Sequence, residues 1–197
     1  PANQTYEYTY TLKPISTKDP ADMMADYRTT LPGAKQAVSY DDVAPNHWAN
    51  DAIRYVADKG YFAGTSETTF APSTRAMLMT VLASMNGVDT TGGSTWYAKG
   101  MEWAKANGVS DGTNPNGTIT REQLALMLYR DAGSPEVDDL KLIFSDANKV
   151  SSWASDAVTW AVVNGILSGK GNNTLDPQGS ASRAEVAQML YTYSFIR

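Results

Sequence analysis

Three arginines occupy the same chemically unusual position in this sequence. Arg75 and Arg121 follow a threonine and Arg183 follows a serine, in each case where a stretch with helical periodicity begins. A cation in the first turn of a helix faces the positive end of the helix dipole, which costs up to roughly 1 kcal/mol. A locally unfavourable residue that recurs three times indicates either a function or a compensating contact.

Two interpretations of these arginines are open at the level of sequence. In the first, each guanidinium lies beside a helix N-terminus and forms a small anion site together with the unpaired backbone amides. In the second, each arginine pairs with a nearby carboxylate or lays its aliphatic stem over a neighbouring unit. The first makes the arginines ligand contacts, and the second makes them structural.

The helices that begin at these arginines carry clear sequence signals. Thr120 with Gln123, and Ser182 with Glu185, form capping boxes, whereas the box that begins at Thr74 is incomplete. Apolar residues recur at helical spacing behind each start. They predict three buried stripes: Leu78, Val81, Leu82 and Met85; Leu124, Met127 and Leu128; and Val186, Met189, Leu190 and Tyr193.

A tryptophan precedes each of these helices at a fixed spacing from other residues. A second aromatic residue follows it by 7 positions and two glycines follow by 12 and 16. Regular spacing of this kind indicates an internal repeat, here three units of about 50 residues that fill 40–197. The three sets are Trp48, Tyr55, Gly60 and Gly64; Trp96, Trp103, Gly108 and Gly112; and Trp153, Trp160, Gly165 and Gly169.

Each unit is predicted to contain a first helix that begins just before the tryptophan. Asn46, Ser94 and Ser151 are the expected N-caps. The helix is expected to end at the first glycine of each set, which takes the left-handed conformation without a steric cost. Gly100 stands where the other two units have alanine, which predicts a close helix contact.

The tryptophans themselves have two interpretations. Indole rings stack on sugar faces, which would make Trp48, Trp96 and Trp153 binding residues. Their place at the head of an apolar stripe favours a core role instead, with a rim that could line a groove. The aromatic residues seven positions later are expected in the core for the same reason.

Composition excludes several function classes. Hydrophobic residues make up 42% of the 197 residues, which is enough for a core, and no apolar run approaches the roughly 20 residues of a membrane span. The chain has no cysteine and one histidine, His47, so thiolate chemistry and histidine metal cages are not expected. A net charge of −5 argues against a nucleic-acid partner.

One stretch imitates a metal site. Residues 112–123 place Asn114, Asn116 and Gly117 as a calcium-binding EF-hand loop would, but Gly112 and Gln123 stand where the two key carboxylates should be. We therefore expect no metal and no cofactor. No pair of carboxylates is arranged for glycoside hydrolysis, so we expect no catalytic residues.

Residues 1–39 lie outside the repeat. Tyr6, Tyr8, Tyr10 and Leu12 alternate with polar residues and predict one strand, and a short helix is expected at 21–28. This segment is interpreted as an extension or a linker from an upstream domain. The expected units that follow are 40–87, 88–140 and 141–197.

Taken together, the repeated residues resemble the S-layer homology (SLH) family. That family's pattern runs from an aspartate through Trp-Ala and a helix-ending glycine to Phe-x-Pro and Thr-Arg-Ala-Glu. The second unit departs most, with Tyr97 after its tryptophan and no Phe-x-Pro, and the first has Met77 for the final glutamate. The best matches are Asp42, Trp48-Ala49, Phe70-Ala71-Pro72 and Thr74-Arg75-Ala76, and then Asp146, Trp153-Ala154 and Ser182-Arg183-Ala184-Glu185.

The resemblance implies a fold and a function. The fold is mainly all-α, with three helix-loop-helix repeats forming a pseudo-threefold spindle around a central helical bundle. The function is non-enzymatic anchoring at the bacterial cell surface, through secondary cell-wall polysaccharide that often carries pyruvylated N-acetylmannosamine. The glycan would lie in grooves between repeats, unequal in competence, and the chain would be a monomeric pseudo-trimer. The implied glycan-binding residues are Arg75, Arg121, Arg183, Trp48, Trp96, Trp153, Gly64, Gly112 and Gly169.

Three rival functions stay open. The same fold could hold peptidoglycan directly instead of a pyruvylated polymer. The chain could be a contact domain of an S-layer lattice, in which the arginines serve contacts between copies. A glycan hydrolase is the third, and the sequence offers it no carboxylate pair in a cleft.

Overall fold

The computed structural model describes residues 43–44, 46–61, 74–138 and 140–197. The chain divides into two compact units, Pro1–Ala37 and Val38–Arg197, and every described residue belongs to the second. The strand and helix expected before residue 40, and the site residue Gly64, lie outside the described residues. The same holds for Asp42 and for the segment 70–72.

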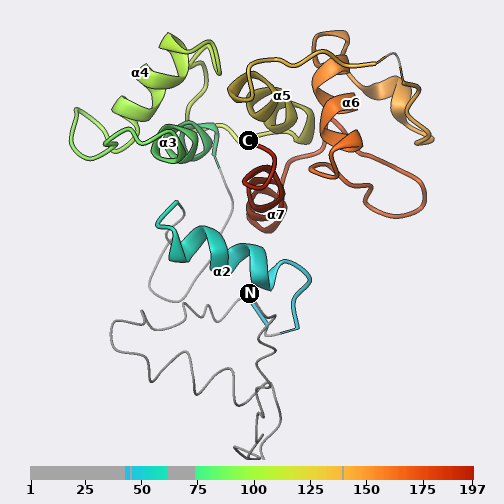
Figure 1. The fold of residues 1–197 in the computed structure, drawn as a ribbon, viewed down its shortest axis with the longest axis horizontal. Coiled ribbons are helices and arrows are strands. Elements are labelled where there is room, and N and C mark those ends of the chain that lie inside the picture. Colours follow the sequence, from blue (N-terminus) through green and yellow to red (C-terminus); the bar gives the residue numbers. More distant parts are fainter. Residues whose placement is uncertain (1–42, 45, 62–73, 139) are drawn as a thin grey trace, which may run out of the picture. The chain divides into compact units, whose positions relative to one another are not determined.

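The described part is helical, with six α-helices and two short 3₁₀ helices (Figure 1). Within it, backbone pairing of the β type is limited to isolated bridges such as Thr74 with Thr118 and Thr120 with Ser180. This confirms the mainly all-α fold. The elements are α2 (Asn50–Asp58), α3 (Arg75–Met85), α4 (Ala98–Ala106), α5 (Arg121–Asp131), η1 (Ala147–Lys149), η2 (Ser152–Ala154), α6 (Ser155–Val163) and α7 (Arg183–Tyr193).

The second helix of each repeat begins where the sequence predicts. Thr74, Thr120 and Ser182 are the N-caps of α3, α5 and α7, and each side chain accepts a hydrogen bond from the third backbone amide of its helix. The capping box is complete in α5 and α7, with the side chains of Gln123 and Glu185 closing it. The predicted stripes are buried, except that Met85 is only partly covered.

The first helix of each repeat begins later than predicted. The N-caps of α2, α4 and α6 are Ala49, Tyr97 and Ala154, and none makes a side-chain capping bond. Ser151 caps only the 3₁₀ helix η2, also without a side-chain bond, and Asn46 and Ser94 cap no helix. The predicted ends are confirmed, because Gly60, Gly108 and Gly165 follow the C-caps with φ between 68° and 71°.

This later start places the three tryptophans outside the buried stripes. Trp48, Trp96 and Trp153 each precede their α-helix by two residues and are 62%, 57% and 52% exposed. The prediction that they belong to the core is therefore wrong, because a residue in the turn before a helix does not follow the helical period. The aromatic residues seven positions later do contribute to the core, with Trp160 buried and Tyr55 and Trp103 packed against it.

The helices pair across repeat boundaries in a closed order. The second helix of one repeat packs against the first helix of the next, as α3 does with α4 and α5 with α6. Helix α7 of the third repeat packs against α2 of the first, which closes the ring (Figure 1). Each first helix therefore buries its apolar face against a different repeat from its own.

Gly100 has the close contact that its place in α4 predicts. A Cβ atom added to Gly100 would lie 2.6 Å from Cα and 2.8 Å from Oγ1 of Thr80 on α3. Backbone atoms cannot move aside as a flexible side chain can, so alanine does not fit there without shifting the helices. The glycine thus permits the α3–α4 contact.

A polar network joins the C-terminal ends of α3, α5 and α7. Asp131 accepts hydrogen bonds from the Tyr193 hydroxyl at 2.7 Å and from the Asn86 side-chain amide at 2.8 Å. The Asn86 side-chain oxygen in turn accepts a bond from Arg197 at 2.6 Å. Burial and the neighbouring Asp131 raise the pKa of Tyr193, so its hydroxyl remains a donor.

None of the helices in the described part of the chain has the length and hydrophobicity that a membrane-spanning helix needs.

Candidate functional site

Two cavities of the described part lie where three repeats meet. We name them the Arg121 groove and the Arg75 groove after the helix-start arginine that each contains. Their volumes are about 530 Å³ and 310 Å³. The Arg121 groove is lined by Trp48, Arg121, residues 165–170, Glu185, Gln188 and Met189. The Arg75 groove is lined by Arg75, residues 109–111, Thr113, Gln123, Leu126, Met127, Arg130 and Trp153.

The two grooves are built by the same rule. Each takes its arginine from one repeat, a loop and a helix face from the next, and an exposed tryptophan from the repeat after that. In the Arg121 groove the tryptophan is Trp48 of the first repeat, which the pairing of α2 with α7 brings to the third. The loop that this rule would combine with Arg183 and Trp96 falls within 62–73, outside the described residues.

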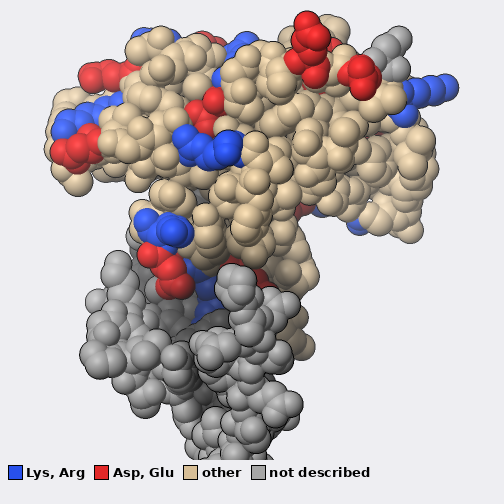
Figure 2. Space-filling view, in the orientation of Figure 1, with Lys and Arg blue, Asp and Glu red and all other residues tan. Residues whose placement is uncertain are grey.

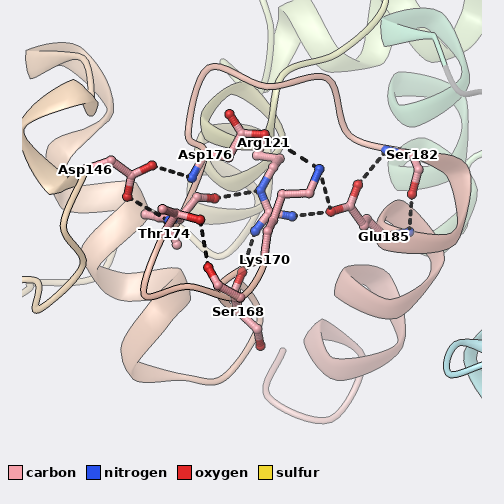
Figure 3. Close-up of polar contacts among 10 residues, drawn as sticks. Arg121, Asp146, Ser168, Lys170, Thr174, Asp176, Ser182 and Glu185 are labelled. Atoms are coloured by element: carbon pink, nitrogen blue, oxygen red, sulfur yellow. Dashed lines mark hydrogen bonds and ion pairs between the residues drawn. The ribbon is translucent and has the colours of Figure 1, made fainter.

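Arg121 is almost completely enclosed by the third repeat (Figure 3). Its Nε donates to the backbone oxygen of Leu175 at 2.9 Å, and its Nη2 donates to the backbone oxygen of Ser168. Its Nη1 lies 2.5 Å from Oε1 of Glu185 on α7. The three nitrogens of the guanidinium are thus all bound to protein acceptors.

The other two arginines also reach across repeat boundaries. Arg75 donates to the Thr113 backbone oxygen at 3.0 Å and pairs with Asp111 at 3.0 Å. Arg183 is buried, and its Nη1 lies 3.5 Å from Sδ of Met77 on α3. Pairing with a carboxylate, one form of the second interpretation, is therefore confirmed for Arg75 and Arg121, and both carboxylates belong to another repeat.

The first interpretation is wrong in one respect for α3 and α5. The amides of Arg75 and Ala76 donate to the backbone oxygens of Gly117 and Pro115 at 3.0 and 2.8 Å. Those of Arg121 and Glu122 donate in the same way to Gly179 and Pro177. Because protein carbonyls occupy these amides, neither helix start offers them to an anion. Gly117 and Pro115 belong to the stretch that resembles a calcium loop, so this stretch caps the N-terminus of α3. Within the described residues, no group of three or more histidine or acidic side chains is placed to hold a metal ion.

Glu122 fixes the position of one tryptophan. It is buried at the start of α5, and its two carboxylate oxygens accept from the backbone amide and the hydroxyl of Ser151, both at 2.9 Å. Ser151 is the N-cap of η2, the short helix that contains Trp153. A buried carboxylate of the second repeat thus anchors the segment that presents an indole to the Arg75 groove.

Two glycines of the predicted site, Gly112 and Gly169, lie where the backbone or the packing leaves no room for a side chain. Gly169 lines the Arg121 groove, and a Cβ there would lie 2.9 Å from both the Phe144 ring and the Thr174 backbone oxygen. Gly112 has a φ of 75° and lies between two residues that line the Arg75 groove. Both allow a tight loop to approach an arginine of another repeat.

Sequence reasoning missed two cations that line the grooves. Lys170 follows Gly169 in the Arg121 groove, and Arg130 lies in the last turn of α5 in the Arg75 groove. Neither cation recurs at the equivalent position of another unit, so the repeat pattern does not indicate them. The sequence features that could have indicated them are the position of Lys170 directly after the repeated Gly169 and the position of Arg130 on the helix that begins at Arg121.

Charged side chains on the face drawn in Figure 2 lie in separate small groups, and several basic groups lie beside acidic ones. Most of that face is uncharged. This face therefore carries no broad basic surface.

Asp146, one of the repeated aspartates upstream of the tryptophans, is buried. Its Oδ1 accepts from the Leu175 amide at 2.7 Å and its Oδ2 from the Asp176 amide at 2.8 Å. The Leu175 amide in particular outweighs the effect of burial and holds the pKa of Asp146 below its ordinary value. These bonds fix the segment whose Leu175 carbonyl binds Arg121.

Acid is expected to weaken the fold through this carboxylate. Because the pKa of Asp146 is lower in the folded state, its stabilising effect is complete above the unfolded-state pKa and is lost as the pH falls through the folded-state pKa. Urea midpoints at pH 7, 5 and 3 should therefore decline mainly below about pH 4. Asp146→Asn should be less stable at pH 7 and show a shallower acid decline. An unchanged decline in that variant would contradict the assignment.

The fold and the grooves define a class of protein, a tandem-repeat module with composite surface grooves. The family model of the S-layer homology domain matches residues 39–75, 89–125 and 143–187. This chain therefore belongs to the S-layer homology domain family. It is an extracellular, cell-surface segment of a bacterial protein.

Relatives of this chain are much longer than it is. It is 31% identical over 178 residues to exoglucanase XynX of Acetivibrio thermocellus, covering 80% of this chain and 16% of that protein. It is 28% identical over 176 residues to an S-layer protein of Bacillus licheniformis, covering 81% and 20%. An undecaheme cytochrome from the S-layer of Carboxydothermus ferrireducens aligns over 85% of this chain and 26% of that one, with 23% identity and a TM-score of 0.39.

Proposed function

We propose that this chain is a non-catalytic anchor that holds its protein on the cell wall by binding secondary cell-wall polysaccharide. The observation that carries the proposal is the make-up of the two grooves. Each combines cationic side chains with an exposed indole from another repeat. The glycan class that fits best is one with an acidic substituent, such as pyruvylated N-acetylmannosamine.

The physical fit has two parts. A pyruvate ketal carries one carboxylate, which a cation binds through charge-assisted hydrogen bonds of about 1.5–3 kcal/mol each. The sugar ring beside it offers an apolar face to the indole of Trp48 or Trp153. Weak binding in a single groove is sufficient for anchoring, because further grooves on the same polymer bind at a high effective concentration.

The relatives are compatible with a module that is shared among different proteins. They include proteins named as glycan hydrolases and as S-layer proteins, of which this chain matches between 9% and 22% of the length. A segment common to such different proteins is better explained by attachment than by one reaction. The arginines at the helix starts would then hold the groove walls together as well as contribute positive charge.

Sedimentation with isolated cell walls tests this function. The chain is mixed with intact walls, with walls stripped of secondary polymer, and with purified peptidoglycan. We expect it to sediment with intact walls only. Equal sedimentation with all three would favour direct peptidoglycan binding. Assembly of the chain into large particles in the absence of walls, together with no binding to any of the three preparations, would favour a lattice contact domain.

A further inference from the structure

The third residue of each second helix differs in chemistry, although the N-cap before each helix has the same extended backbone. In α5 and α7 this residue is Gln123 or Glu185, whose side-chain oxygen accepts from the backbone amide of the N-cap at 3.2 and 2.8 Å, respectively. In α3 it is Met77. Thr74 accepts from the Met77 amide at 3.4 Å, as the other N-caps do, but a thioether has no oxygen with which to complete the capping box.

This third residue also meets a helix-start arginine that comes from another repeat. In α7, Glu185 pairs with Arg121 of the second repeat. Met77 is placed in the same way, because its Sδ lies 3.5 Å from Nη1 of the buried Arg183 of the third repeat. A thioether sulfur is a weak acceptor. The contact between the third and first repeats at this point is therefore weaker than its counterpart between the second and third.

Oxidation gives Met77 the oxygen that it lacks. A two-electron oxidant such as hydrogen peroxide transfers one oxygen atom to the sulfur: the sulfur lone pair forms the S–O bond, the O–O bond breaks, and the peroxide is reduced to water. The sulfoxide oxygen lies as many bonds from the backbone as the side-chain oxygen of glutamine. It can therefore accept from the Thr74 amide, as Gln123 does from its N-cap, or form a charge-assisted hydrogen bond with Arg183.

Met77 belongs to the methionines that an oxidant in solution can reach. The chain is a cell-surface segment, outside the reducing interior of the cell. Among the described residues, Met77 is also the one methionine whose sulfur has a donor within hydrogen-bond distance. The described methionines fall into two groups, the partly buried Met77, Met85 and Met101, and the buried Met79, Met127 and Met189.

We infer that Met77 is an oxidation site, and that its sulfoxide stabilises the start of α3 and the contact between α3 and α7. Oxidation thereby strengthens the junction between the first and third repeats, and methionine sulfoxide reductases reverse the change. Oxidation of a methionine that packs against a core ordinarily has the opposite effect, because the polar sulfoxide disrupts the packing. The sign of the stability change therefore distinguishes this role from damage.

Thermal unfolding before and after peroxide treatment tests the inference. Mass spectrometry of the digested chain gives the fraction of each methionine that carries an added oxygen. Met77→Leu removes the sulfur, and Met77→Gln places an amide oxygen where the sulfoxide oxygen would lie. Met85→Leu is the matched control, because Met85 is also partly buried and lies on the same helix.

Without treatment, Met77→Gln should unfold about 2–4 °C above Met77→Leu, the shift expected for one completed helix cap in a domain of this size. Relative to its effect on Met77→Leu, peroxide should raise the unfolding temperature of the unchanged chain by a similar amount. Met85→Leu should respond as the unchanged chain does, and a methionine sulfoxide reductase should remove the gain.

Three results would overturn the inference. The first is that Met77 stays unoxidised while Met85 and Met101 react. The second is an oxidised Met77 without a gain over the treated Met77→Leu variant. The third is a Met77→Gln variant no more stable than Met77→Leu, because an oxygen at this position would then stabilise nothing.

Discussion

Replacement of Arg121 by alanine should lower the free energy of unfolding by about 3–5 kcal/mol, the range for removing one partner of a buried ion pair. The substitution leaves Glu185 without its arginine and removes the donors that bind the backbone oxygens of Leu175 and Ser168. Equilibrium unfolding in urea measures the effect. Since Arg121 joins the second repeat to the third, the transition should also become broader as the repeats unfold less cooperatively.

Two other variants define what the loss means. Arg75→Ala should cost about 1–2 kcal/mol only, because its partner Asp111 is 64% exposed and water screens the pair. Glu185→Gln keeps an amide oxygen for the cap, as Gln123 does in α5, and removes only the charge beside Arg121. It should therefore lie between the other two. Equal effects of Arg121→Ala and Arg75→Ala would contradict the conclusion that buried contacts of Arg121 hold the second and third repeats together.

Loss of both groove indoles should weaken attachment to cell walls by roughly thirtyfold. Each aromatic contact with a sugar face contributes about 1 kcal/mol, and two grooves on one polymer multiply their effects. The double variant Trp48→Ala with Trp153→Ala should keep the stability of the unchanged chain, since both side chains are more than half exposed. Titration of intact walls with the labelled chain measures the affinity.

Phe195→Ala is the control for this prediction. Phe195 is 68% exposed and lines neither groove, so its removal takes away exposed aromatic surface without touching the candidate sites. The control should bind walls as the unchanged chain does. If the tryptophan double variant also binds normally, the indoles do not contact the glycan and the grooves are not the binding sites.

Local sequence signals predicted the second helices well. A capping box acts through hydrogen bonds between residues three positions apart, and the buried stripe repeats within two turns. Ser182, Glu185 and Leu190 therefore indicate the helix without reference to distant parts of the chain. The helix-ending glycines are equally local, because a positive φ depends on the absence of a Cβ atom. The repeat spacing then extended these signals to the family and to the fold.

The first helices were harder to place because their signals conflict. Asn46, Ser94 and Ser151 are good capping residues, yet the chain makes an extra turn before each α-helix. The N-caps actually used, such as Ala49, make no side-chain bond. Packing against another repeat sets these starts, and it turns each tryptophan outward, which no periodicity within the repeat indicates.

The sequence by itself determined the three-unit repeat, the second helices and the glycines that end the first helices. Only the tertiary structure decided the partners of each arginine, the exposure of the tryptophans and the presence of Lys170 and Arg130 in the groove linings. The physical reason is distance along the chain. Capping and periodicity act over a few residues, whereas Arg121 meets Glu185 across 64 positions and shares its groove with Trp48 only because α2 packs on α7.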